Sequence, residues 1–367
     1  MKVDILTLFP EMIKPFLENS IIQRATEKNI AEINYINIRE FSKDKHKKVD
    51  DYPFGGSEGL LMACQPIDDA FKSIKGEPLK IYLSPKGRKV NQNIIEFLSA
   101  QPHVAYLCGH YEGVDQRIID KHIDLELSLG DFVLTGGEIA CSALVDASLR
   151  LVDGTLSSDE AYQNESFYKN LLEAPSYTRP REYEGQEVPE VLLSGNHAEI
   201  KKWQDEQAII ETKKHRPDLL ASQRVGILGG SFDPIHESHI KIASLALEQN
   251  NLDKVLFIPT NKSADKTPHL PAHARATKVM QAIKDYDKFD IDMCEIRRGD
   301  VTYAIDTIKY LQQKYPAAKF YYIIGSDTKK TLHNWKDYDK VLDLIEFIVF
   351  ERDEISSTKI RESWELT

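Results

Sequence analysis

The feature that most constrains this fold is an alternation of short apolar strands with amphipathic helices, which runs through the chain twice. The strand candidates of the first series are residues 3–9, 33–38, 80–83 and 104–107. At Arg224 the pattern begins again, and its strand candidates are residues 225–228, 255–258, 320–324 and 347–350. Strands separated by helices are typical of mostly parallel α/β sheets. The sequence therefore predicts two complete α/β units.

The break between the two series predicts a domain boundary near residues 220–223. A polar amphipathic helix is expected over residues 197–214, and His215-Arg216-Pro217-Asp218 ends it. A length of 367 residues suits about two domains. We therefore expect one domain over residues 1–220 and a second over residues 224–367.

The composition limits the classes of protein to which the chain can belong. No run of about 18 apolar residues occurs, which argues against a membrane span, and the start at Met1 lacks the apolar core of a signal peptide. The four cysteines, Cys64, Cys108, Cys141 and Cys294, form no CxxC pair. That pattern is typical of reduced thiols in the cytoplasm. We therefore expect a cytoplasmic protein without disulfides or a structural zinc site.

The net charge of −11 makes the whole chain a poor bulk binder of nucleic acid, because neutralisation of phosphates drives non-specific affinity. Any contact with RNA must therefore use local basic clusters. The candidates are Lys43, Lys45, His46, Lys47 and Lys48 in one stretch, and Lys86, Arg88 and Lys89 in another. Either cluster taken alone is equally typical of a solvated loop.

Three glycine-bearing loops follow strand candidates of the first series, at residues 83–87, 108–113 and 129–138. Loops after the carboxyl ends of strands are where open α/β sheets bind ligands, and glycine lets a ligand approach the backbone closely. None matches GxGxxG or a P-loop, which argues against an ordinary dinucleotide or triphosphate site. One such loop is more often a tight turn, but three together favour a binding site.

Around these loops the chain resembles the bacterial tRNA (guanine-N1)-methyltransferases of the trefoil-knotted SPOUT class. Besides the loops, the matching residues are Leu6, Phe9-Pro10, Val49-Asp50-Asp51, Phe54-Gly55-Gly56, Tyr177-Thr178-Arg179-Pro180 and Leu192-Leu193-Ser194-Gly195-Asn196-His197. The resemblance covers nearly all of residues 1–220. It implies a knotted α/β domain with a small helical C-terminal part, although knotted chains are rare. It also implies a homodimer through this domain, with an active site shared between subunits, and a tRNA substrate methylated on the guanosine immediately 3′ of the anticodon.

The methyl donor implied by the resemblance is S-adenosylmethionine, held in a bent form by the knot loops. The positions that match the family's donor contacts are Tyr82, Leu83, Ser84, Pro85, Gly109, Leu129, Gly130, Phe132, Val133, Leu134, Gly136 and Gly137. The chain departs from the family at three nearby positions. Ser57 and Glu58 stand where glycine and proline are usual, and Ala140 stands where many relatives have proline.

Methylation of guanine N1 requires loss of the N1 proton before or during attack on the methyl carbon. A positioned carboxylate can accept that proton, and a cationic donor near O6 can stabilise the charge that develops on the base. The resemblance places Glu165 at the position of the base, where aspartate is more usual, and Arg150 at that of the cationic donor. The extra methylene of Glu165 changes the reach of the carboxylate. Without the resemblance, Glu165 would be interpreted as a solvated loop residue.

The second series opens with a turn that suits an anion. Residues 229–233 follow a strand candidate and lead to a helix start, where free N–H groups form an anion site. His236 and His239 are three residues apart and share one helix face. No third ligand has the spacing of a zinc site, so no metal centre is predicted. Two imidazoles at a helix start suit a polyphosphate better, although without the glycine turn they would equally be surface histidines.

These residues resemble the nucleotidyltransferases with an HxGH signature and, among them, the nicotinate-mononucleotide adenylyltransferases. Residues 355–361 match the family's ISSTxxR element, and residues 323–327 with Asn334-Trp335 match its middle segment. The resemblance implies a Rossmann-like α/β domain. It also implies transfer of adenylate from ATP, with Mg²⁺, to nicotinate or nicotinamide mononucleotide in NAD biosynthesis.

The resemblance gives each matching residue a role. His236 and His239 would hold the triphosphate. The other residues that would bind the nucleotide in this turn are Gly229, Gly230, Ser231, Phe232 and Asp233. Ser357, Thr358 and Arg361 would bind phosphate from a second helix, with the forked donors of arginine, and Trp335 would stack on the pyridine ring.

The second series departs from its family more than the first does. Ser238 replaces the glycine of HxGH, Ala304 replaces a hydroxyl residue, and the sequence ends at Thr367, soon after the ISSTxxR match. An alternative from another class is therefore a methyltransferase whose second unit is a nucleotide-sensing or dimer-bracing module without catalysis. From the residues alone, the prediction would be only a nucleotide-binding protein.

Overall fold

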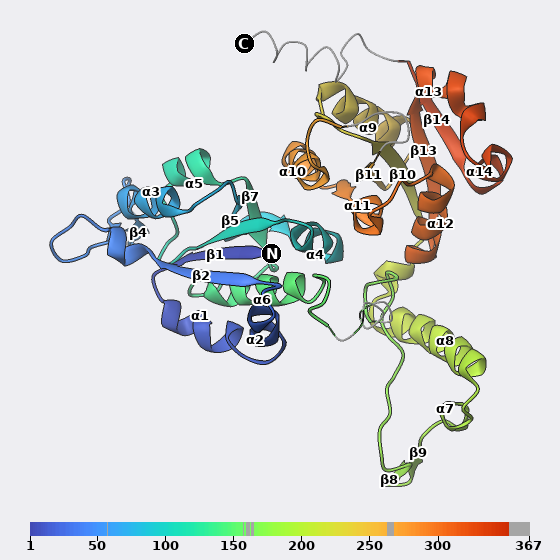
Figure 1. The fold of residues 1–367 in the computed structure, drawn as a ribbon, viewed down its shortest axis with the longest axis horizontal. Coiled ribbons are helices and arrows are strands. Elements are labelled where there is room, and N and C mark those ends of the chain that lie inside the picture. The colour runs from blue at the N-terminus through green and yellow to red at the C-terminus, as the bar shows by residue number, and fades with distance from the viewer. Residues whose placement is uncertain (57, 157, 159–161, 163–164, 263–267, 352–367) are drawn as a thin grey trace.

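Two parallel five-stranded sheets, one in each half of the chain, form the framework of the molecule (Figure 1). The structure is a computed structural model, and it describes residues 1–351 apart from 57, 157, 159–161, 163–164 and 263–267. Helices cover both faces of each sheet. The α/β class predicted from the alternating pattern is therefore confirmed, and the trefoil knot stays a prediction.

The first sheet has the order β2-β1-β6-β5-β7, and all neighbouring strands are parallel. Its strands are β1 (Lys2–Thr7), β2 (Glu32–Asn37), β5 (Leu79–Lys89), β6 (His103–Cys108) and β7 (Leu125–Ser128). The sequence prediction missed β7, because this four-residue strand contains Glu126 and follows Asp124, so it lacks a continuous apolar run.

Side chains that alternate along β1 divide the first half into two cores. Val3 and Ile5 pack with the helices α1 (Pro10–Leu17), α2 (Ser20–Glu27), α4 (Gln92–Ser99) and α6 (Glu138–Leu149). Leu6 packs on the opposite face with η1 (Ile38–Phe41), α3 (Cys64–Ser73) and α5 (Gln116–His122). A two-stranded ribbon of β3 (Asp50–Asp51) and β4 (Leu61–Met62) completes this side. Each face of the sheet is therefore buried, as expected for parallel strands.

The first glycine-bearing segment is not a loop after a strand, as the sequence predicted, but a bulge inside β5. Leu83 and Arg88 both pair with Leu127 on β7, so the four residues between them are displaced from the ladder. Gly87 permits the close approach, because a Cβ there would collide with the backbone of Leu127.

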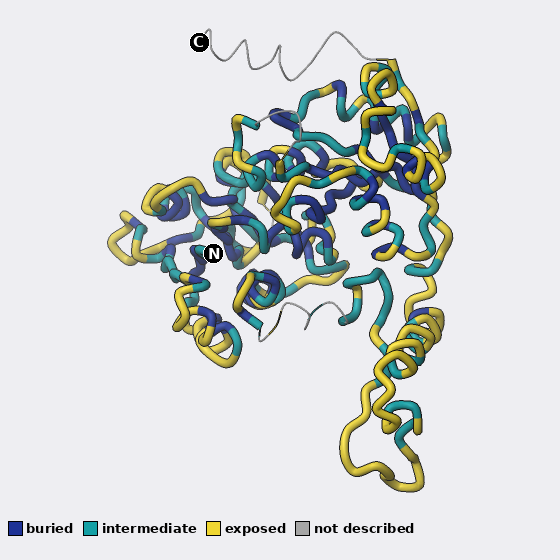
Figure 2. Tube along the Cα trace, turned by 45° about the vertical axis from the view of Figure 1, so that its right-hand side comes forward, coloured by how far each residue is buried: buried dark blue, intermediate teal, exposed yellow. Residues whose placement is uncertain are grey.

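An extended arm leads from the first half to the second. It comprises β8 (Glu182–Tyr183), β9 (Gln186–Glu187), α7 (Glu190–Leu193), α8 (His197–His215) and η2 (Pro217–Leu220). The predicted helix over residues 197–214 is confirmed as α8, whose N-cap Asn196 accepts a hydrogen bond from the Glu199 N–H. Figure 2 shows that the arm is mostly exposed, and in α8 only Thr212 is buried.

The second sheet has the order β12-β11-β10-β13-β14 and is also parallel. Its strands are β10 (Gln223–Gly230), β11 (Lys254–Pro259), β12 (Phe289–Ile291), β13 (Ala318–Gly325) and β14 (Glu346–Phe350). Its helices are α9 (Glu237–Gln249), α10 (Ala272–Ile283), α11 (Cys294–Arg298), α12 (Ala304–Lys314), α13 (Ser326–Thr331), η3 (Leu332–Asn334) and α14 (Tyr338–Leu344). The order reverses between β10 and β13, which is the Rossmann-like switch point where such sheets bind ligands.

The strand β12 was not predicted, because it has only three residues and its centre is Asp290. It lies at the edge of the second sheet and contacts α4 of the first half. Within the described ranges, no helix has both the length and the apolar character needed to cross a membrane.

Candidate active sites

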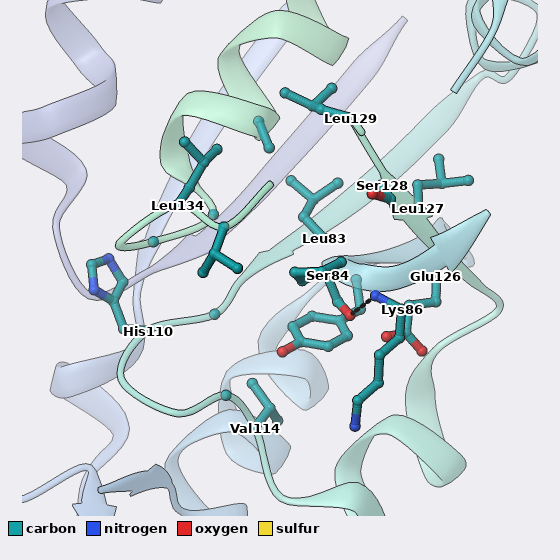
Figure 3. A pocket seen from close by; sticks show the side chains of 18 of the residues that line it. Leu83, Ser84, Lys86, His110, Val114, Glu126, Leu127, Ser128, Leu129 and Leu134 are labelled. Atoms are coloured by element: carbon teal, nitrogen blue, oxygen red, sulfur yellow. Dashed lines mark hydrogen bonds between the residues drawn. The ribbon is translucent and has the colours of Figure 1, made fainter. Parts of the chain in front are cut away.

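A cavity of about 340 Å³ lies where the three glycine-bearing segments of the first half meet (Figure 3). The β5 bulge, the loop after β6 and the segment from β7 into α6 form its walls. Every residue predicted to contact the methyl donor lines it, namely Tyr82, Leu83, Ser84, Pro85, Gly109, Leu129, Gly130, Phe132, Val133, Leu134, Gly136 and Gly137. The structure thus brings the whole predicted set to one place. Donor binding by these residues stays a prediction.

The cavity has an apolar side and a polar side (Figure 3). Leu83, Leu129 and Leu134 gather at one side, whereas the side chains of Lys86 and Glu126 lie together at the other. Burial raises the pKa of Tyr82 to about 12, so its hydroxyl stays protonated at neutral pH. A ligand that combines an apolar ring with polar and charged groups suits this lining.

A buried carboxylate that the sequence analysis did not select fixes two of these walls to each other. Glu138, in the first turn of α6, accepts the Thr7 hydroxyl at 2.5 Å and bonds the His110 ring at 2.8 Å. Beside it, the Gly137 N–H donates to the Gly109 carbonyl at 2.9 Å. An acidic residue directly after a glycine pair at a helix start was the available signal, since a negative charge there is favoured by the helix dipole.

Substitution of Gly137 by alanine is expected to damage the cavity. The added Cβ would lie 2.8 Å from the Cys108 Cα and 3.1 Å from the Gly109 nitrogen, and backbone cannot move away cheaply. We expect a loss of about 1–3 kcal/mol in the free energy of unfolding, measured in urea, together with weaker donor binding. The control is Gly325→Ala, because a Cβ at Gly325 meets no atom within 4 Å. Equal stability of both variants would contradict this description of the cavity.

The predicted base and the predicted cationic donor form a bidentate pair. The Arg150 guanidinium donates to both carboxylate oxygens of Glu165, at 2.7 and 2.6 Å, and both side chains are half-buried. The Glu165 carboxylate raises the pKa of Arg150 above its usual value. A carboxylate oxygen keeps a second lone pair and guanidinium keeps further N–H groups, so each partner can still bond a substrate.

In a single chain, this pair lies far from the donor cavity. The cavity contacts the start of α6, at Gly137 and Ala140, whereas Arg150 follows the last residue of the helix. A helix of 12 residues is ~18 Å long. Neither Arg150 nor Glu165 is among the residues that line the cavity.

The two predicted basic clusters are partly occupied by other contacts. In the first, Lys43 and Lys48 form ion pairs with aspartates at 2.8 and 3.0 Å. In the second, Lys89 pairs with Asp131 at 2.5 Å, and Arg88 points into the second half of the chain. Arg88, one of the candidate RNA contacts, instead bonds residues that are about 200 positions away in sequence.

In the second half, a buried arginine that the sequence analysis missed supports the glycine turn after β10. Arg275 donates to the carbonyls of Leu270, Thr260 and Asn261 at 3.1, 2.6 and 3.0 Å, and also to that of Ser231. The Thr260 N–H in turn donates to Gly230 at 3.0 Å. Arg275 therefore ties the turn to the end of the neighbouring strand.

Asp233, predicted to contact the nucleotide, is buried beside this turn. Its carboxylate accepts the backbone N–H groups of His269 and Leu270 at 2.6 and 3.3 Å. The structure thus shows Asp233 fixing a neighbouring loop, and its contact with a nucleotide stays a prediction.

The two predicted histidines meet at the start of α9. His236 is the N-cap, its backbone N–H donates to the His239 Nδ1 at 3.2 Å, and the ring centroids lie 3.9 Å apart. Phe232 packs edge-on against His239 at 5.1 Å. Ser238 lies between the two histidines in the sequence. Its buried hydroxyl has no hydrogen-bond partner in the part of the chain that the structure describes.

Trp335 lies near the same edge of the sheet. Its ring packs against Tyr322 at 5.4 Å and Phe347 at 6.1 Å. The Tyr322 hydroxyl lies against Gly229, where a Cβ would approach it to 2.6 Å. Tyr322 therefore links the predicted pyridine-binding residue to the glycine turn.

Three predicted phosphate-binding residues, Ser357, Thr358 and Arg361, lie outside the described residues. Over the positions that are described, no group of three His, Cys, Asp or Glu side chains is placed to hold a metal ion.

Comparison with known proteins relates each half to a family. The family described as "tRNA (Guanine-1)-methyltransferase TrmD" matches residues 1–222, and a family described as "Cytidylyltransferase-like" matches residues 227–363. A tRNA (guanine-N(1)-)-methyltransferase of Clostridium botulinum is 55% identical over 227 residues, which cover 61% of this chain and 94% of that protein. That of Ruminiclostridium cellulolyticum is 52% identical over 223 residues, which cover 60% and 96%. With more than half of its length matched, the chain belongs to the TrmD family of tRNA (guanine-1)-methyltransferases and continues into a cytidylyltransferase-like part.

Proposed function

We propose that the first half transfers a methyl group from S-adenosylmethionine to N1 of a tRNA guanosine, the one immediately 3′ of the anticodon. The observation that carries this proposal is the convergence of all the predicted donor contacts on one cavity. Its volume of about 340 Å³ falls within the range of small-molecule sites. The relatives at 55% and 52% identity bear the name of the same activity.

The chain's own residues would act on the guanine. When bound, the donor supplies a methyl carbon activated by an adjacent sulfonium. Glu165 would accept the proton from N1, and the N1 electron pair would form the new bond to the methyl carbon as the bond from that carbon to sulfur breaks and the sulfur leaves as a neutral thioether. Arg150 would donate to O6, where negative charge develops as the proton leaves. The bidentate contact between the two holds both groups in one plane before the substrate arrives.

We also propose that the active unit is a homodimer, in which Arg150 and Glu165 of one chain serve the cavity of the other. The separation of the pair from its own cavity along α6 supports this arrangement. So does the exposure of large apolar side chains beside the cavity, because Val133 is 83% and Ile139 59% exposed. Contiguous exposed apolar groups mark interaction sites.

If the active unit is this dimer, Ile139→Asp should disrupt both the dimer and methyl transfer. A charge in an apolar interface is expected to shift the full chain from dimer to monomer in sedimentation equilibrium and to abolish most methyl transfer. Ile209→Asp, on the exposed arm, is the control for charge alone. A fully active monomer would contradict the shared site.

For the second half, we propose transfer of adenylate from ATP to nicotinate or nicotinamide mononucleotide, assisted by Mg²⁺. The acceptor phosphate would attack the α-phosphorus and release pyrophosphate. The support is the position of the glycine turn, His236 and His239 at the switch point of a Rossmann-like sheet. The cytidylyltransferase-like match supports nucleotidyl transfer in general. We propose a pyridine mononucleotide as the acceptor because Trp335 matches the residue that would stack on the pyridine ring.

The alternative function is a module that binds nucleotide without turnover, or that braces the first half. The buried Ser238 in place of a glycine favours it, because a side chain now fills space at the start of α9.

We further propose that residues 1–220 and 224–367 are the two domains.

A further inference from the structure

The two halves meet across a buried and charged contact. Lys314 of α12 inserts between the halves, and its ammonium lies 2.9 Å from Glu96 of α4 and 2.9 Å from Asp292. It also donates to the Asn93 side chain at 3.1 Å. Burial lowers the pKa of Lys314, but Asp292, Tyr315, Glu96 and Tyr310 together outweigh burial, so the pKa lies well above its usual value. Buried charges of this kind are tolerated only in fixed geometry, so the contact is specific.

Arg88 extends this contact to the donor cavity. Its guanidinium donates to the carbonyl of Ile283 at 3.1 Å and to that of Phe289, and lies 3.5 Å from the Asp290 carboxylate. Asp290 also accepts Asn91 and Asn93 at 3.1 and 3.0 Å. A residue of β5 is thereby held at three points by the end of α10 and by β12.

The contacts of Arg88 with the second half lie next to the cavity of the first half. Arg88 is the residue at which β5 rejoins the ladder after the bulge of residues 84–87, and this bulge forms one wall of the donor cavity. The same wall faces a second cleft, of about 1210 Å³, between the halves. The residues that line both spaces are Pro85, Lys86, Gln116, Ile119, Glu126 and Leu127. These six residues therefore separate the cavity of the first half from the cleft between the halves.

We infer that Arg88 is a positioning residue for the methyl donor, and that the second half of the chain supplies the surface against which it positions the bulge. The second half is therefore a structural part of the methyltransferase site, whatever reaction it catalyses itself. This inference rests on the proposed function of the cavity.

The test measures binding of S-adenosylmethionine and S-adenosylhomocysteine to the full chain by calorimetry. Arg88→Ala is expected to weaken binding about tenfold, because charge-assisted hydrogen bonds contribute more than ordinary ones. Asp290→Ala, which changes only the second half, is expected to weaken it about threefold or more through Arg88, Asn91 and Asn93. In turnover assays both variants should raise KM for the donor more than they lower kcat, a split that a general loss of fold would not produce. Arg24→Ala, on the exposed α2, is the control.

Each outcome decides the inference. If Arg88→Ala and Asp290→Ala bind donor as the parent does, the second half does not position the bulge. Weakening by Arg88→Ala alone would still support the inference, because Asp290→Ala leaves the bonds from Arg88 to the carbonyls of Ile283 and Phe289 in place. Should Arg88→Ala fail to fold, Asp290→Ala carries the test. A parent chain that binds neither ligand would instead refute the proposed function of the cavity.

Discussion

Replacement of Glu165 by glutamine is expected to lower the rate of methyl transfer by about 10²–10⁴-fold, because an amide cannot accept the N1 proton. The change keeps the size of the side chain, and the amide oxygen can still accept one bond from Arg150. Donor binding should therefore stay at the level of the parent. The rate is measured as labelled methyl incorporated into tRNA under single-turnover conditions, and donor binding by calorimetry.

A matched control for this substitution is Asp218→Asn. Asp218 also forms a bidentate pair with an arginine, at 2.9 and 2.7 Å, but in an exposed turn outside both candidate sites. The Asp218→Asn variant should transfer methyl to tRNA at the rate of the parent protein. If Glu165→Gln is as active as Asp218→Asn, Glu165 is not the base, and the pair with Arg150 is only structural.

Replacement of His239 by alanine is expected to lower adenylyl transfer by about 10²–10³-fold and to leave tRNA methylation unchanged. His239 lies where the α9 N–H groups and the glycine turn converge, so its ring would meet the charge on the leaving pyrophosphate. Loss of one preorganised donor typically has an effect of this size. The measurement is dinucleotide formation from ATP and each pyridine mononucleotide.

The control for His239→Ala is His215→Ala, at the exposed end of α8. A parent protein that binds ATP but makes no dinucleotide from either mononucleotide would favour the module that binds nucleotide without turnover. In that case His239→Ala should weaken ATP binding alone.

The strands that the sequence predicted are rich in apolar residues, whether they are central like β10 or at a sheet edge like β2 and β14. Residues 225–228 and 255–258 are continuous apolar runs, and β10 and β11 contain them. The missed strands β7 and β12 are short and contain Glu126 and Asp290. Their positions depend on neighbours distant in sequence, which periodicity cannot detect.

The sequence predicted where the candidate sites lie, but not all the residues that support them. Glycine-bearing segments after strands predicted a binding site from the residues alone, but the identity of its ligand came from a family resemblance. Glu138 and Arg275 were missed, because a charged residue is read as exposed unless its buried partners are known. For the same reason, the sequence offered Arg88 only as an RNA contact or a solvated residue, whereas its partners are mainly backbone carbonyls of the second half.

The most direct test of two activities in one chain is product analysis by mass spectrometry on a single preparation of the full protein. One reaction contains tRNA and S-adenosylmethionine, and the other contains ATP, Mg²⁺ and nicotinate or nicotinamide mononucleotide. We predict N1-methylguanosine in the digested tRNA of the first and a pyridine dinucleotide in the second. Methylated tRNA without any dinucleotide would contradict the two-enzyme account and leave a methyltransferase with a second part that does not catalyse.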